Sequence, residues 1–271
     1  CLRHMFRLHV SVVLCFCGVG SSMIELKNAG ELEHMAQAGR VVAGLLERLA
    51  SIVRPGVKTK ELDADARDYL RTHGAQPAFL GYRGFPASIC VSINEEVVHG
   101  IPGERRIRDG DLVSLDAGAV VAGWFADAAT TVLVGTVPPL ARRLTETTRR
   151  ALEEAIAQVA VGHRLSDISH AVQHLVEHEG FGVVREFVGH GIGRALHEDP
   201  PIPNFGPPNT GPRLQVGMAL AIEPMVTAGS YEVEVLRDGW TAVTKDRSLA
   251  AHFEHTIVVT EHGPTILTRP G

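Results

Sequence analysis

The sequence contains few cysteines and carries little net charge, and each shortage excludes a class of protein. Cys1, Cys15 and Cys17 all fall near the start, which leaves Cys90 as the one cysteine of the remaining chain. A single cysteine cannot build a disulfide framework, so a reducing, cytoplasmic compartment is the simpler expectation. The net charge of −5 at pH 7 gives no general attraction to nucleic acid or to an acidic membrane surface, so we expect neither as a partner.

The chain also lacks an apolar run that would span a bilayer comfortably. The run from Val10 to Val19 follows two arginines, like a short secretory signal, but a spanning helix needs ~20 residues. Met23 begins a stretch typical of a natural start. We interpret residues 1–22 as a leader derived from a vector or from upstream translation, with a processed targeting segment as the alternative. Residues 23–271 are expected to form one domain.

What is present is the composition of a soluble globular protein. The 271 residues are 45% hydrophobic and 21% charged, enough to bury a substantial core. Apolar periodicity indicates two pairs of helices, each pair followed by strands. The predicted helices are 29–53, 60–74 with Thr59 as its N-cap, 140–161 and 166–179; the predicted strands are 88–93, 112–121, 124–134, 181–188, 218–222 and 250–260, with a hairpin at 230–246 and a surface loop at 199–212.

The order of two helices followed by strands occurs twice, which favours an α/β (α+β) domain built from two similar halves. A pseudo-twofold axis between the halves would set Asp116 opposite Glu223 and Asp127 opposite Glu254, close to the midline. The similarity of the two halves in sequence is faint, so this prediction rests on the order of the elements.

Four carboxylates stand in apolar runs, where an unpaired charge is too costly to bury. They are Asp116, Asp127, Glu223 and Glu254, and His190 follows a strand-like run in a glycine-flanked turn. Four carboxylates and one imidazole form an oxygen-rich set, which suits two divalent ions such as manganese, iron or cobalt better than a closed structural zinc site. Asp127 and Glu254 would bridge the ions, Asp116 would complete one, and His190 with Glu223 would complete the other.

Three residues of the constellation suit acid–base and substrate-binding roles. Two ions sharing a water can activate it and polarise a carbonyl. Glu223 could take the proton from that water, while His99 and His197 could hydrogen-bond the substrate and the tetrahedral intermediate.

These motifs resemble those of the type I methionine aminopeptidases in order and spacing, over about residues 24–268. They are Val98-His99-Gly100-Ile101-Pro102, Ser114-Leu115-Asp116, Asp127, Gly189-His190-Gly191-Ile192-Gly193, Ala221-Ile222-Glu223-Pro224-Met225 and Glu254-His255-Thr256. The resemblance implies the pita-bread fold, with a central antiparallel sheet flanked by helices. It also implies a dinuclear site of cobalt, manganese or iron, or of zinc.

The implied reaction is removal of the initiator methionine from nascent polypeptides with a small second residue, by attack of the metal-bridging water on the first peptide carbonyl. The family's metal ligands fall on Asp116, Asp127, His190, Glu223 and Glu254, and its substrate-side histidines fall on His99 and His197. The short interval between His190 and Glu223 excludes the type II insertion, so the bacterial single-domain form is the better match. A monovalent cation near Asn94 is a further implication of the resemblance.

The implied methionine pocket is apolar, because a thioether is recognised by shape and soft contacts. Its walls fall on Tyr82, Phe85, Cys90 and Trp240, with His99 at the edge. From the residues alone, Trp240 could equally be core packing, and Cys90 is better explained as a small buried hydrophobe than as a nucleophile.

Three positions depart from the family pattern. Phe79 and Leu196 stand where some relatives have a cysteine and a phenylalanine, and Gly118 stands where relatives often have a small hydroxyl residue. These departures affect the expected size of the pocket and not the reaction.

Two other readings stay open from the sequence. The first is another pita-bread hydrolase such as an Xaa-Pro aminopeptidase, and the second is a pita-bread binding protein without catalysis. We expect a monomer that acts on peptide or nascent-chain N-termini, and contact with the ribosome is conceivable. The basic stretch at 142–150 is interpreted as a solvated helix face.

A second group of histidines lies outside the motifs, at four-residue intervals in the last predicted helix. His170, His174 and His178 could chelate zinc in pairs. The apolar residues of that helix lie on the opposite face, so we interpret these histidines as solvated, with adventitious metal binding as the alternative.

Overall fold

The computed structural model describes residues 24–269. The leader predicted at 1–22 lies outside the described residues. Four helices occur in the described part of the chain, and they are α1 (Ala29–Ile52), α2 (Thr59–Thr72), α3 (Pro139–Ala157) and α4 (Leu165–His178). All four were predicted, although α3 ends earlier than expected. None of the helices in this range is both long and apolar enough to cross a membrane.

The caps explain where the first two helices begin. Asn28 caps α1, because its side chain accepts a hydrogen bond from Glu31 N while the Glu31 carboxylate accepts one from Asn28 N. The prediction that Thr59 caps α2 was wrong, since Lys58 holds that position. The Thr59 hydroxyl instead accepts a hydrogen bond from Gly103 N at 2.8 Å, which ties the helix start to a distant loop.

The strands are short except for one hairpin. They are β1 (Gln76–Pro77), β2 (Ile89–Ile93), β3 (Glu96–Val98), β4 (Leu112–Val121), β5 (Trp124–Leu133), β6 (Gly182–Val183), β7 (Gly189–Gly191), β8 (Glu198–Ile202), β9 (Ala219–Ile222), β10 (Met225–Thr227), β11 (Val233–Val235), β12 (Ala242–Thr244), β13 (Ala250–His252), β14 (Glu254–Thr260) and β15 (Gly263–Ile266). A 3₁₀ turn spans Tyr82–Gly84. The predicted β4–β5 hairpin is confirmed, and its turn residues Ala122 and Gly123 have φ of 51° and 79°, as in a type I′ turn.

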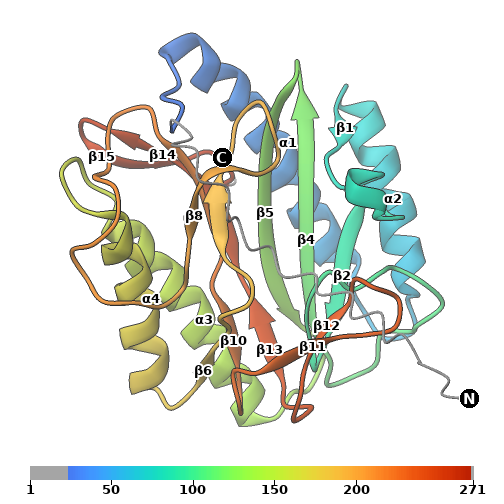
Figure 1. Ribbon diagram of the computed structural model, residues 1–271. Coiled ribbons are helices and arrows are strands. Elements are labelled where there is room, and N and C mark those ends of the chain that lie inside the picture. Colours follow the sequence, from blue (N-terminus) through green and yellow to red (C-terminus); the bar gives the residue numbers. More distant parts are fainter. Residues whose placement is uncertain (1–23, 270–271) are drawn as a thin grey trace, which may run out of the picture.

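The central sheet is antiparallel throughout its described pairs and runs in the order β1-β4-β5-β14-β9-β7-β8, with β2 beside β4 and β15 beside β14 (Figure 1). Two small sheets, β13-β10-β6 and β11-β12-β3, complete the fold. Strands β5 and β14 therefore lie at the centre, with β4 and β9 outside them. This is the order that a pseudo-twofold axis between the halves predicts.

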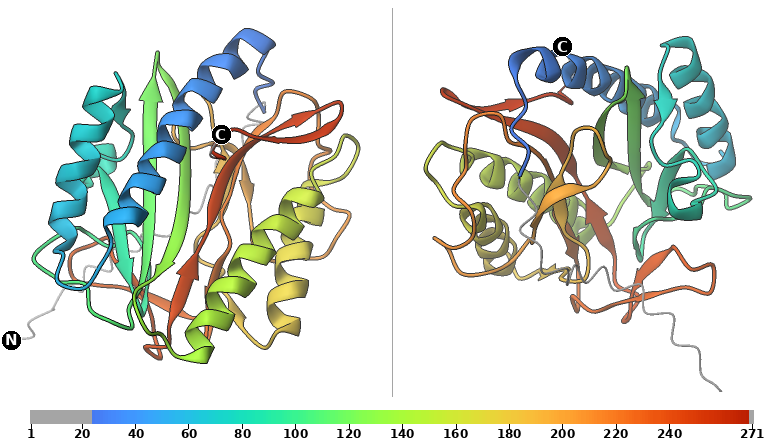
Figure 2. Two further views of the ribbon diagram at one scale, coloured as in Figure 1. Left: turned by 180° about the vertical axis from the view of Figure 1, so that it is seen from behind. Right: turned by 45° about the horizontal axis from the view of Figure 1, so that its top comes forward.

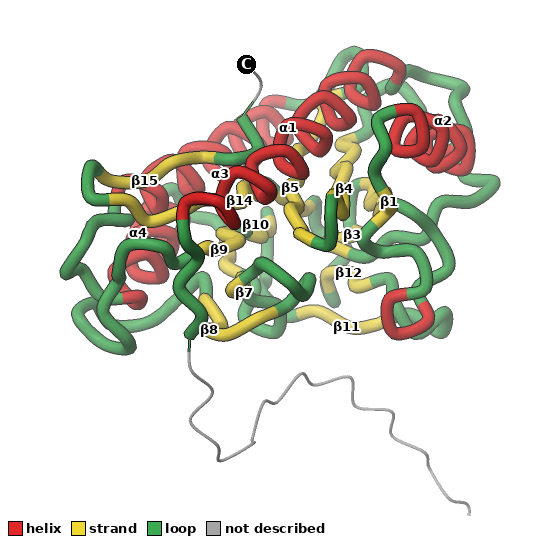
Figure 3. Tube along the Cα trace, turned by 90° about the horizontal axis from the view of Figure 1, so that it is seen from above, coloured by secondary structure: helices red, strands yellow, loops and turns green. Residues whose placement is uncertain are grey.

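All four helices cover one face of the central sheet (Figure 2). One apolar core lies between α1, α2 and the strands β2, β4 and β5, and a second lies between α3, α4 and the strands β9 and β14. Seen along the sheet, β7, β8, β11 and several loops lie on the side opposite the helices (Figure 3). The expected fold class, an antiparallel sheet flanked by helices, is confirmed.

Three strand predictions were wrong in detail. The strand expected at 181–188 is confined to β6, and Phe187, beyond its end, packs edge-on against the His99 ring. The loop expected at 199–212 begins with β8, which pairs with β7. The strand expected at 250–260 breaks at Phe253, so that β13 joins β10 while β14 joins the central sheet.

Candidate metal centre

Five neighbouring strands of the central sheet each place one potential metal ligand in the same region. In sheet order these are Asp116 on β4, Asp127 on β5, Glu254 at the start of β14, Glu223 directly after β9 and His190 on β7. The structure therefore brings together all five residues that the sequence predicted as ligands.

The strand register puts these side chains on one face. Asp116 and Glu254 lie on either side of Ala129 of β5, and Asp127 is two residues from Ala129. Across the next two pairs, His255 lies opposite Ile222 and His190 opposite Ala221. Because side chains alternate between faces along a strand, all five ligands point to the side away from the helices.

The polar atoms at the centre of this face are close and buried. One ligand atom each of Asp127, His190 and Glu254 lie within 4.8 Å of one another, and the three residues are 3–6% exposed. His190 Nε2 is 3.6 Å from Asp127 Oδ2 and 3.6 Å from Glu223 Oε1.

The carboxylates repel one another and are poorly solvated. Burial, followed by the neighbouring negative charges, raises the pKa of Asp116, Glu223 and Glu254 well above their usual ranges. Burial also raises the pKa of Asp127, against the opposing effect of His190. Asp116 Oδ1 is buried and finds no hydrogen-bond donor within the described chain. Divalent metal ions would offset the mutual repulsion of these buried carboxylates and would coordinate the unpaired Asp116 oxygen, so the residues present fit such ions.

Hydrogen bonds outside the cluster orient its members. His190 Nδ1 lies 2.9 Å from the carbonyl oxygen of Gly191, to which only an N–H can donate, so Nδ1 carries a proton and Nε2 is the nitrogen directed at the carboxylates. The Thr256 hydroxyl donates to the Asp127 carbonyl at 2.8 Å and accepts from Asp127 N at 3.0 Å. Asn204 Nδ2 donates to the Glu223 carbonyl at 3.0 Å.

His197 lies beside the cluster and is fixed by Tyr82. The His197 and His190 rings have their centres 4.1 Å apart, and His197 Nδ1 is 2.8 Å from the Tyr82 hydroxyl. The turn before His197 is held by Glu198, whose carboxylate accepts hydrogen bonds from the backbone N–H groups of Arg194 and Ala195. The buried Lys27 ammonium lies 2.5 Å from Glu198 Oε2.

The predicted pocket walls divide into two groups. Phe85 and Cys90 form one apolar cluster against which Trp240 packs, and the ring centres of Phe85 and Trp240 are 5.1 Å apart. Cys90 pairs directly with Asp116 across β2 and β4, so the cluster borders the metal ligands. His99 stands at the edge of Trp240, with ring centres 6.2 Å apart. Tyr82 belongs instead to the group around Trp124 and Leu196.

His99 has an unusual backbone and a neutral ring. Its φ of 61° places a non-glycine residue in the left-handed region, which costs about 1–3 kcal/mol and is typical of functional sites. Burial lowers the pKa of His99 to about 4, so the ring is neutral near pH 7.

Two of the departures from the family pattern are explained by one contact. A Cβ added at Gly118 would stand 2.8 Å from Ala78 Cβ and 2.8 Å from Phe79 Cε1. Ala78 and the Phe79 ring together therefore occupy the space that a side chain at position 118 would need. Leu196, the third departure, is buried beside Ile192 and Trp124.

Sequence reasoning missed several residues around the site. His252 is 2% exposed and its Nε2 lies 3.7 Å from Glu223 Oε2. Burial lowers the pKa of His252 to about 3, so it remains neutral beside the carboxylate. Thr256 and Phe187 were missed as well. The alternation of β13 and β14 could have marked His252 and Thr256 as inward-facing polar residues, while Phe187 gave no such signal.

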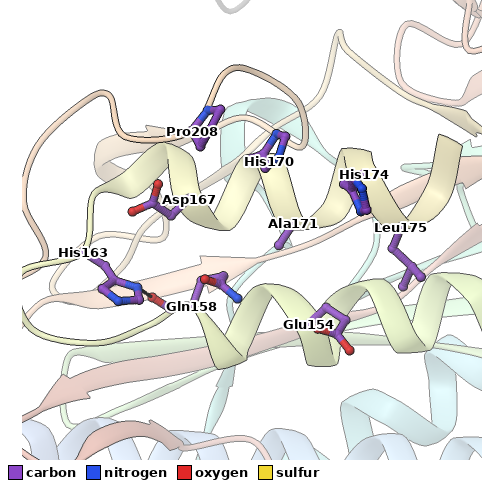
Figure 4. A pocket seen from close by; sticks show the side chains of 9 residues that line it. All are labelled: Glu154, Gln158, His163, Asp167, His170, Ala171, His174, Leu175 and Pro208. Atoms are coloured by element: carbon purple, nitrogen blue, oxygen red, sulfur yellow. Dashed lines mark hydrogen bonds between the residues drawn. The ribbon is translucent and has the colours of Figure 1, made fainter. Parts of the chain in front are cut away.

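Other predicted features lie away from this centre. The Asn94 amide is engaged structurally, donating to Asp111 Oδ1 at 2.9 Å and accepting from Leu112 N at 3.0 Å. His170, His174 and His178 lie on α4, on the helical side of the sheet, and the first two line a groove between α3 and α4 (Figure 4).

Comparisons with known proteins agree with this geometry. The sequence profile of metallopeptidase family M24 matches residues 33–261. The chain is 53% identical over 247 residues to methionine aminopeptidase 1 of Bacillus subtilis, covering 91% of this chain and 100% of that protein. The crystal structure of methionine aminopeptidase from Thermotoga maritima superposes with a TM-score of 0.90 at 48% identity, over 91% of this chain and 100% of that one.

A more distant likeness concerns the fold alone. The prolidase from Pyrococcus furiosus matches with a TM-score of 0.73 at 21% identity, over 91% of this chain and 66% of that one. Its curled antiparallel sheet is the pita-bread arrangement expected from the sequence. The family profile spans the whole ligand set, and the more similar relatives are aligned over nearly their full length. The chain therefore belongs to metallopeptidase family M24, within its methionine aminopeptidase branch.

Proposed function

We propose that the protein is a metal-dependent aminopeptidase that removes an N-terminal methionine from polypeptides with a small second residue. The observation that carries this proposal is the position of the apolar cluster of Phe85, Cys90 and Trp240 directly beside five converging metal ligands. An unbranched thioether side chain fits such a cluster, and its peptide bond would then lie over the ligands.

Asp116, Asp127, His190, Glu223 and Glu254 would hold two divalent ions, of cobalt, manganese, iron or zinc. Ions bound there would supply an activated water and a Lewis acid for the scissile carbonyl. Glu223 is the proposed proton acceptor, because burial and neighbouring carboxylates raise its pKa. His99, which is neutral near pH 7, and His197, which is held by the Tyr82 hydroxyl, would donate hydrogen bonds to the substrate backbone.

The remaining proposals concern context. Residues 23–271 would act as a single catalytic domain and as a monomer in the cytoplasm, on peptide or nascent-chain N-termini that meet the enzyme at the ribosome. The pocket would also include Tyr82 at its rim. A monovalent cation would lie near Asn94. Backbone carbonyl oxygens would coordinate it, because the Asn94 side-chain amide already hydrogen-bonds Asp111 and Leu112.

The test is release of methionine from Met-Ala-Ser by metal-stripped protein, with and without added manganese or cobalt, beside Glu223→Gln. We expect metal-dependent release that the variant loses. An Xaa-Pro peptide should not be cleaved; its cleavage in place of Met-Ala-Ser would favour the Xaa-Pro aminopeptidase alternative. If the folded protein released no methionine with any divalent ion, the alternative of a binding protein without catalysis would be favoured.

A further inference from the structure

The groove between α3 and α4 gathers metal-binding side chains on the opposite side of the sheet from the central cluster. It encloses about 420 Å³ and is lined by Glu154 of α3, by Gln158 directly after α3, by Asp167, His170 and His174 of α4, and by His163 of the connecting loop (Figure 4). Only some of these side chains have nitrogen or oxygen atoms that are not already engaged in hydrogen bonds.

The hydrogen bonds of the groove separate structural from unassigned residues. His163 Nδ1 is 2.9 Å from the Gln158 carbonyl oxygen, and both Asp167 oxygens accept backbone N–H groups, from Arg164 and Asn209. These side chains hold the loops at the helix ends. Within residues 24–269, no hydrogen bond or ion pair is found for the side chains of Glu154, His170 or His174. They are therefore free to bind a ligand.

The two histidines are one helical turn apart and close to chelating distance. Their ring centres are 5.9 Å apart, with the ring planes at 44°. Two imidazoles on one tetrahedral zinc have ring centres about 5 Å apart, given a Zn–N bond of about 2 Å. Small rotations of two side chains at i and i+4 close the difference.

The neighbouring pair is less suitable. An ion bound to a ring nitrogen lies close to the plane of that ring, so the planes of two chelating rings must meet at the ion. The rings of His174 and His178 are farther apart, at 6.4 Å, and are stacked at only 4° from parallel, so sharing an ion would need larger rotations of both side chains. His178 also does not line the groove, whereas His170 and His174 both do.

We propose that His170 and His174 form a peripheral two-histidine site for one borderline divalent cation such as Zn²⁺, Ni²⁺ or Cu²⁺. Imidazole prefers these ions, and water molecules complete the coordination. The site is separate from the central cluster, so the protein binds one more ion of this class than that cluster holds.

The test is equilibrium dialysis of the metal-loaded protein against micromolar Ni²⁺, counting ions per chain. His170→Ala should bind one ion fewer than the wild type, while the matched control His178→Ala should bind as many as the wild type. Both variants should keep wild-type peptidase activity and circular dichroism, since neither residue contacts the central cluster.

The proposal is overturned if His170→Ala binds as many ions as the wild type, or if His178→Ala loses the same ion. A second measurement does not depend on a variant. In nitrogen-15 spectra of the histidine rings, added Zn²⁺ should shift His170 and His174 and leave His178 in place. Shifts of His178 without His170 would also overturn the assignment.

Discussion

The two halves of the molecule position their candidate metal ligands by different means. In the first half, Asp116 and Asp127 belong to one continuous hairpin whose ten-residue strands are paired along their whole length. In the second half, His190, Glu223 and Glu254 come from separate short strands, and β7 shifts register against β8.

The difference shows two ways of fixing a side chain. A regular ladder positions its residues through backbone hydrogen bonds, so neighbouring side chains matter little to the site. The irregular half depends on individual side chains, such as Asn204 on the Glu223 carbonyl and Glu198 on the turn before His197. Substitutions of residues that bind no metal should therefore harm activity more in the second half and at the junction of the two halves.

The largest expected loss of activity comes from removing a candidate metal ligand, and it should be the same for either half. Asp127→Asn and Glu254→Gln each remove a ligand at the centre of the sheet. Both should lower kcat/KM at least about a thousandfold, equivalent to about 4 kcal/mol of transition-state stabilisation. Methionine release from Met-Ala-Ser under excess metal measures this, and a variant with more than a tenth of wild-type activity would remove its residue from the ligand set.

The same Glu254→Gln change should stabilise the metal-free protein. Burial and then the charges of Asp127, Glu223 and Asp116 raise the pKa of Glu254 well above 4.5, so its ionised form destabilises the fold. The variant should gain about 1–3 kcal/mol at pH 8 in the presence of a chelator.

The sign of the pH dependence follows from linkage. A carboxyl whose folded pKa is raised destabilises the protein above that pKa, and the penalty disappears as pH falls toward the unfolded value near 4.5. Urea unfolding of both proteins at several pH values should therefore show the gap closing on acidification. A gap that widens would contradict the electrostatic explanation.

The next largest effect is expected at Thr256, where the two halves of the sheet meet. Beyond the Glu254–Ala129 and His255–Ala128 pairs, β14 leaves β5, and the Thr256 hydroxyl replaces the missing ladder bonds to Asp127. Thr256→Val would leave Asp127 N–H and C=O unsatisfied, at a cost of about 1–3 kcal/mol. Activity should fall about 10–100-fold, as for other residues that orient metal ligands.

Ser114→Ala is the matched control for Thr256→Val. Ser114 is also buried and bonds Thr131 Oγ1 at 2.8 Å, but it lies in the continuous ladder of β4. It should keep nearly all activity, and an equal loss in both variants would refute the contrast between the halves.

The smallest expected effect concerns Tyr82, which joins a turn of the first half to His197 of the second. Tyr82→Phe removes the 2.8 Å hydrogen bond but keeps the ring. We expect kcat to fall about tenfold with KM little changed, because His197 loses its orientation. Phe85→Leu should instead raise KM. If Tyr82→Phe changed KM alone, Tyr82 would act as part of the pocket wall and not by orienting His197.

The sequence was sufficient where structure is local. The helices and the β4–β5 hairpin follow from periodicity and turn residues, and the fold class follows from motifs in fixed order, which also named the five candidate ligands that converge in the structure. Contacts between distant segments were missed. Lys58 is the N-cap of α2 in place of Thr59, whose hydroxyl accepts a hydrogen bond from Gly103 N instead. The strand predicted at 250–260 is divided in two because its parts pair in different sheets.

The same limit applies to the candidate site. His252 and Thr256 stand in an apolar run, and nothing local shows that one approaches Glu223 and the other Asp127, 129 residues away along the chain. Their roles depend on which strands become neighbours in the sheet.

The contact between Gly118 and Phe79 constrains how this pocket can change. With a side chain at position 118, a phenylalanine at 79 would overlap it, because the two would be separated by 2.8 Å. Ala78 Cβ lies equally close, so a change at 79 alone would not clear the space. Glycine at 118 therefore lets the Phe79 ring lie against β4, and regaining a side chain there requires both the Phe79 ring and the Ala78 segment to move.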